Sequence, residues 1–110
     1  MITIKRGEDY TKHLLFQYAD TLNPVDLTGC DAYCQMRKVP AGELLATAIC
    51  SFLNYTDGYI LFSFSSEQTA NLPLGRCGLD VWITENGRKH PVYASECEII
   101  DGYTDISNIF

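Results

Sequence analysis

The chain has 110 residues, of which 46% are hydrophobic, 12% aromatic and 20% charged, a composition typical of one globular domain. Eight basic and fourteen acidic residues give a formal net charge of -6. This balance argues against a non-specific nucleic-acid binder and against docking on an anionic membrane, because both need a basic surface. No apolar run approaches the roughly 20 residues of a membrane span, and the first residues lack the features of a signal peptide. We therefore expect a protein made in the cytoplasm and used without export.

Alternation of apolar and polar residues with a period of two dominates the chain and predicts β-strands. The predicted strands, in chain order, lie at residues 1–4, 10–18, 30–37, 43–52, 59–64 and 77–84. The segment 43–52 is ambiguous, because its Leu-Leu-Ala-Thr-Ala run also suits a helix; its neighbours favour a strand. Asn86-Gly87 predicts a tight hairpin after the strand at 77–84, since both residues tolerate positive φ. The residues beyond the hairpin predict a further strand, with Glu96 and Glu98 on one face.

A short helical turn is predicted at residues 65–71, where Ser65 suits the N-cap and Leu72-Pro73 ends the turn. Seven or eight short strands separated by turns predict an all-β fold, a two-sheet antiparallel β-sandwich that is immunoglobulin-like or jelly-roll-like. We assign residues 1–100 to this domain and residues 101–110 to a C-terminal arm.

Five cysteines, an odd number without repeated spacing, argue against a secreted disulfide scaffold. We expect reduced thiols that serve as small core residues. The two histidines, His13 and His90, are expected at the surface. No arrangement of residues predicts catalysis, a metal site or a cofactor, so the chain is predicted not to be an enzyme.

Two groups of residues are candidates for contacts with other molecules. Tyr33, Trp82 and Tyr93 are candidate surface aromatics, with Trp82 and Tyr93 facing each other across the hairpin; such aromatics form protein interfaces or sugar-binding platforms. Apolar residues at both chain ends are candidate contacts with a neighbouring subunit through strand addition; the alternative is that both ends complete the sandwich. These residues are Met1, Ile2, Ile4, Ile106, Ile109 and Phe110.

Several segments in order resemble small β-sandwich proteins of tailed bacteriophages. They are Lys5-Arg6-Gly7-Glu8-Asp9-Tyr10, Asn23-Pro24-Val25-Asp26-Leu27-Thr28-Gly29, Gln35-Met36-Arg37-Lys38, and the stretch from Ser65 to Asp80 that contains Leu72-Pro73-Leu74-Gly75. Together they span residues 5–100. The chain departs from the family pattern at Cys77-Gly78 and at its end, residues 102–110.

The resemblance is to the immunoglobulin-like domain at the N-terminus of phage baseplate upper proteins and to capsid decoration or staple proteins of short-tailed phages. It implies a structural virion protein without catalytic residues, which decorates or staples the capsid by binding the major capsid protein. A homo-oligomer, with a dimer favoured, is expected. The alternatives are a tail or baseplate adaptor that connects a fibre or receptor-binding protein and, from another class, a carbohydrate-binding module that uses Trp82.

Overall fold

The computed structural model describes residues 1–102, which form eight β-strands, one α-helical turn and one 3-10 turn. The elements are β1 (Ile2–Lys5), β2 (Tyr10–Leu15), β3 (Asp31–Lys38), β4 (Leu44–Thr47), β5 (Ile49–Asn54), η1 (Tyr55–Asp57), β6 (Tyr59–Phe64), α1 (Ser66–Ala70), β7 (Gly75–Glu85) and β8 (Arg88–Ile100).

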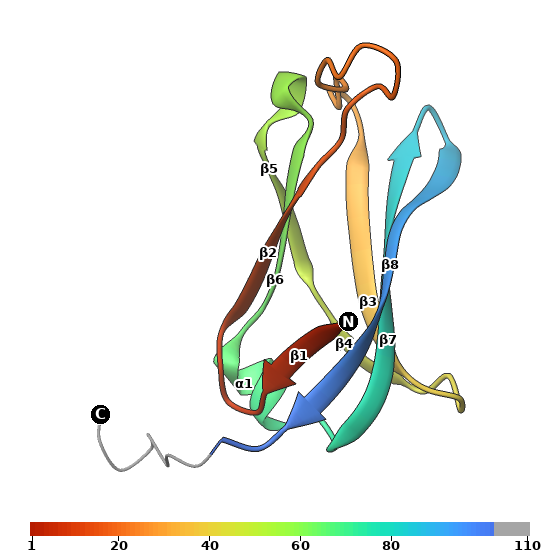
Figure 1. The fold of residues 1–110 in the computed structure, drawn as a ribbon. Coiled ribbons are helices and arrows are strands. Elements are labelled where there is room, and N and C mark those ends of the chain that lie inside the picture. Colours follow the sequence, from red (N-terminus) through yellow and green to blue (C-terminus); the bar gives the residue numbers. More distant parts are fainter. Residues whose placement is uncertain (103–110) are drawn as a thin grey trace.

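The strands form two sheets, one of five strands in the order β1-β8-β7-β3-β4 and one of three in the order β2-β6-β5. Figure 1 shows the β2–β6–β5 layer on the left facing the layer that contains β3, β7 and β8 on the right. The predicted all-β, two-sheet sandwich is thus confirmed. The expectation of wholly antiparallel sheets is wrong at one edge, because β1 pairs with the last strand, β8, in parallel.

The core lies between the two sheets and receives alternate residues of each strand. From the three-stranded sheet come Phe62 and Phe64, and from the five-stranded sheet come Met36 and Val81, all 1% exposed or less. The rings of Phe62 and Tyr93, on opposite sheets, have centroids 6.5 Å apart. Burial of these apolar side chains is the main stabilising term of the fold.

The segment predicted as one strand at 43–52 forms two strands that belong to different sheets. β4 pairs with β3, and β5 pairs with β6 in the other sheet. Between them lies the buried Ala48, whose backbone N–H donates to the carbonyl of Cys34. One continuous extended stretch therefore joins the edges of both sheets.

The predicted turns form as their residues require. Asn86 and Gly87 both have positive φ in the β7–β8 hairpin. Ser65 caps α1 by accepting from the backbone N–H of Gln68, and the Gln68 side chain accepts from the N–H of Ser65 in return.

Thr69, on α1, connects the end of the three-stranded sheet to the loop between β1 and β2. Its fully buried hydroxyl donates to the carbonyl of Glu8 over 2.6 Å and accepts from the N–H of Gly7 over 3.0 Å. Since β1 belongs to the five-stranded sheet, this hydroxyl helps hold one end of the sandwich closed, where α1 and β1 lie together in Figure 1.

Candidate interaction surfaces

Tyr33 on β3 and Trp82 on β7 lie side by side on the outer face of the five-stranded sheet, because they are direct cross-strand partners. Tyr33 is 55% exposed and Trp82 is 37% exposed. With Thr84 and Lys89 they line an open hollow of about 390 Å³. The alternation of β3 and β7 places both aromatic side chains outward, since their neighbours Cys34 and Val81 are buried in the core.

A second, larger hollow of about 610 Å³ lies further along the same face. Gly78, on β7, is part of its lining, and Val39 and Pro40 of the β3–β4 turn form one side of it. Asp80 connects the two hollows: it lines the larger one and accepts a hydrogen bond of 3.0 Å from the indole Nε1 of Trp82. This bond fixes one edge of the indole ring and leaves the ring body to line the smaller hollow.

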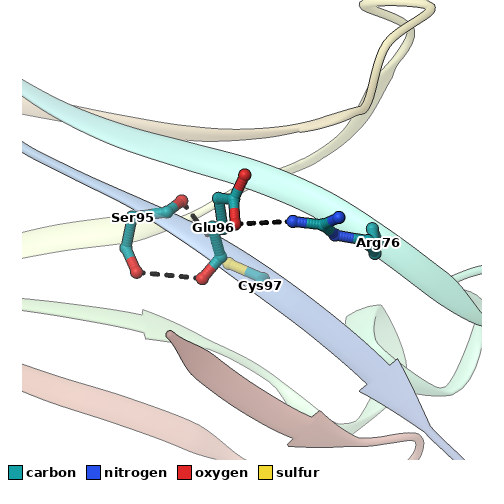
Figure 2. A network of polar contacts seen from close by, with 4 residues as sticks. All are labelled: Arg76, Ser95, Glu96 and Cys97. Carbon is teal, nitrogen blue, oxygen red and sulfur yellow. Dashed lines mark hydrogen bonds and ion pairs between the residues drawn. The ribbon is translucent and has the colours of Figure 1, made fainter.

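Charged side chains surround the larger hollow. Figure 2 shows Arg76 on β7 reaching across to Glu96 on β8, with Nη2 and Oε2 2.7 Å apart. Next to this pair, the hydroxyl of Ser95 donates to the carbonyl of Glu96. Arg37, at the other side, donates to the carbonyl of Gly42 and to the Gln35 side chain. The outer face of the five-stranded sheet therefore combines an aromatic pair with fixed charges of both signs.

Tyr93 does not join the aromatic pair, so the predicted contact between Trp82 and Tyr93 is wrong. Tyr93 is the partner of Val81 on β8, and a register irregularity between Val81 and Trp82 pairs Trp82 with Pro91. Tyr93 consequently shares the inner side of the sheet with Val81 and packs against the core. The Nζ atom of Lys12 lies 6.0 Å from the centroid of its ring.

The candidate subunit contacts at the chain ends divide into three groups. Ile2 and Ile4 are buried in the core, because β1 is an integral strand of the five-stranded sheet. Their side chains complete the sandwich, whereas a contact of these two residues with a neighbour by strand addition at the edge strand β1 stays a prediction. Met1 is exposed and stays a candidate. The remaining three, Ile106, Ile109 and Phe110, lie outside the described residues, as does most of the predicted arm at 101–110.

All five cysteines are free, and four of them are buried, as predicted for core residues. Burial, followed by the nearby Cys50 and Asp80, raises the pKa of Cys34 to about 12. Cys77 and Cys97 are cross-strand partners on β7 and β8. Their mutual hydrogen bond and then burial raise the pKa of Cys97. Cys34 and Cys97 are therefore protonated at neutral pH, which disfavours their reaction as nucleophiles.

The two histidines, His13 on β2 and His90 on β8, are both exposed, as predicted. Within residues 1–102, no three His, Cys, Asp or Glu side chains gather in a way that would hold a metal ion. No helix in this part of the chain is long and apolar enough to cross a membrane.

The outer face of the three-stranded sheet is a surface that the sequence analysis missed. Register and alternation place eight residues there: Thr11, His13 and Leu15 from β2, Tyr59, Leu61 and Ser63 from β6, and Ile49 and Ser51 from β5. The ninth is Leu53, the exposed extra residue of the register irregularity between Phe52 and Asn54 of β5. Five are large hydrophobic residues, and none carries a formal charge at pH 7. We call these nine residues the apolar face. The sequence signal was present in the uncharged runs 44–54 and 59–64, but their alignment needed the strand register.

The sequence matches no protein-family model. It also matches no curated protein. The fold, however, is similar to that of solved structures. The N-terminal domain of phage TP901-1 ORF48 matches it with a TM-score of 0.50 and 12% sequence identity, over 90% of this chain and 83% of that chain. At this identity the likeness shows a shared fold, a two-sheet β-sandwich that is also found in a phage protein.

Proposed function

We propose that this chain is a non-enzymatic structural protein of a tailed-bacteriophage virion and that it acts by binding neighbouring virion subunits. The observation that carries the proposal is the likeness of nearly the whole sandwich to a domain of a phage protein. The ordered sequence resemblance over residues 5–100 points to the same class of protein.

The outer face of the five-stranded sheet is the surface we assign to the neighbouring subunit. An aromatic anchor surrounded by polar and charged groups is typical of the central part of protein interfaces, where Trp, Tyr and Arg contribute most of the binding energy. Trp82 and Tyr33 supply the anchor, and Arg37 and the Arg76–Glu96 pair supply the surrounding charges. We propose the major capsid protein as the partner, with this chain decorating or stapling the shell.

A second position, an adaptor in the tail or baseplate, is favoured by the nature of the structural neighbour, which is one domain at the start of a phage protein. The two positions predict different copy numbers. Quantitative mass spectrometry of purified virions measures the ratio of this chain to the major capsid protein. A ratio near parity supports decoration of the shell, a few copies per particle support the tail adaptor, and absence from the particle contradicts the proposal.

The contact itself is tested with particles that lack the protein, to which purified variants are added back. Trp82→Ala is expected to weaken rebinding at least about 30-fold, since truncation of an interface anchor typically costs on the order of 2 kcal/mol. Tyr18→Ala is the control, because Tyr18 is an exposed aromatic residue outside both sheets. Equal rebinding of wild type and Trp82→Ala would remove this face from the interface.

The smaller hollow, which Trp82 lines, also supports a function of another class, that of a carbohydrate-binding module, because exposed aromatic rings stack on sugars. Titration with an oligosaccharide panel tests it. Saturable binding that is lost in Trp82→Ala and kept in Tyr18→Ala would favour the sugar-binding function over the structural one.

A further inference from the structure

The apolar face differs from what the composition of the chain leads one to expect. One residue in five is charged, yet the nine residues of this face include no Asp, Glu, Lys or Arg. Ile49 and Leu53 are the most exposed of its large side chains, at 71% and 62%. An uncharged surface with several exposed large hydrophobic side chains on a small protein is typical of an interaction site, because contact of these side chains with water is unfavourable.

The apolar face continues into an open sheet edge. Within residues 1–102, β5 pairs with β6 on one side, and no other strand of this part of the chain pairs with its second side. Exposed edges are normally protected from pairing by charged residues or proline. The opposite edge strand, β2, contains Lys12, whereas β5 contains neither a charge nor a proline. The backbone N–H and C=O groups on this second side of β5 are thus available to another strand.

The net charge of the chain limits how two of its copies can bind each other. Two copies of this chain repel each other, since each carries a net charge of -6. A contact between two copies is therefore favoured where it brings no carboxylates together, and the apolar face meets that condition. A strand that pairs with its own copy also gives a closed, two-fold symmetric interface.

We propose that two copies of the chain form a dimer by antiparallel pairing of β5 with β5 of the second copy, with the two apolar faces joined into one surface. A two-fold axis beside Ser51 sets the register, because antiparallel pairing about that residue brings Ile49 of one copy near Leu53 of the other, at the irregularity that follows Phe52. The uncharged side chains of this edge then lie next to each other on the outer face, and each β5 completes its hydrogen bonding. This inference does not depend on the proposed virion role.

Analytical ultracentrifugation of the full chain tests the dimer. Wild type is expected to sediment as a dimer, and Leu53→Lys is expected to raise the dimer dissociation constant at least about 100-fold, because a charge would be placed in the desolvated contact. Ile49→Lys provides a second, independent variant. Leu74→Lys is the matched control, since Leu74 is an exposed leucine in the loop before β7. Circular dichroism confirms that each variant is folded.

Three results would overturn the proposal: a monomeric wild type at high concentration, a dimer that survives both lysine variants, or a dimer lost equally in Leu74→Lys. The register is tested by cysteine crosslinking with oxygen and a copper catalyst as the oxidant. Ser51→Cys is expected to give a covalent dimer, because its two copies meet at the axis. Thr11→Cys, on the same face but on β2, is expected to remain uncrosslinked, and the reverse pattern would contradict the register.

Discussion

The two sheets of the sandwich differ in the size of the side chains on their inner sides and in the charge on their outer sides. The five-stranded sheet carries small thiols on its inner side, with Cys34, Cys77 and Cys97 all buried, and charged residues on its outer side. The three-stranded sheet carries aromatic rings on its inner side and an uncharged outer side. Small inner residues on one sheet leave room for the rings of the other, which is how close packing is reached in a thin core.

The outer sides differ in the contacts that they favour. Fixed charges and two hollows on the five-stranded sheet suit a partner of defined, complementary shape and charge. The apolar face suits a partner that is itself uncharged at the contact, and a second copy meets that requirement. A sandwich with two such unlike faces can hold two different neighbours at once.

The largest expected effect is on the pH dependence of the free energy of unfolding, and it comes from Cys34 on the inner side of the five-stranded sheet. The pKa of Cys34 is about 12 in the folded protein, against 9.0 for an unburied thiol. Burial therefore favours the protonated form, and this contribution to stability is complete below pH 9 and is lost as the pH rises towards 12. The three-unit difference corresponds to about 4 kcal/mol at pH 12.

Urea unfolding from pH 8 to pH 11 measures this loss as a decrease in the free energy of unfolding. Cys34→Ala is expected to flatten the profile, although a small cavity lowers its stability at every pH. If the free energy of unfolding falls with pH equally in wild type and Cys34→Ala, Cys34 ionises equally in the folded and unfolded chain. The inner sides of the two sheets would then differ only in the size of their side chains.

The next largest expected effect is on the free energy of unfolding and comes from Thr69, at the end of the sandwich that its hydroxyl helps hold closed. Thr69→Val keeps the shape of the side chain but leaves the carbonyl of Glu8 and the N–H of Gly7 without their partner. We expect a loss of about 1–3 kcal/mol in the free energy of unfolding, the usual cost of unpaired, partly buried polar groups. Thr69→Ser, which keeps the hydroxyl, should lose less. A Thr69→Val variant as stable as wild type would mean that packing alone holds this end closed.

The sequence predicted the fold better than the surfaces, for a physical reason. Strand formation and tight turns depend on local alternation and on residues such as Asn86 and Gly87, so they are readable in a single segment. The parallel pairing of β1 with β8 depends on contacts between residues nearly 100 positions apart, which no local pattern records. The face of Tyr93 was mispredicted because one extra residue in β8, opposite the Val81/Trp82 step, reverses the alternation.

The smallest expected effect tests whether the charged face contributes to stability at all. Arg76 and Glu96 form a short ion pair, but their side chains are 65% and 61% exposed, so solvent screens the attraction and ordering two long side chains costs entropy. Arg76→Ala is therefore expected to change the free energy of unfolding by less than about 0.5 kcal/mol, and 1 M salt should erase the difference. Chemical unfolding at low and high salt measures both. If Arg76→Ala leaves the free energy of unfolding unchanged, while one lysine on the apolar face dissociates the dimer, the two outer faces differ in what a charge does there. The role of the Arg76–Glu96 ion pair would then lie in partner binding, which rebinding of Arg76→Ala to particles measures directly.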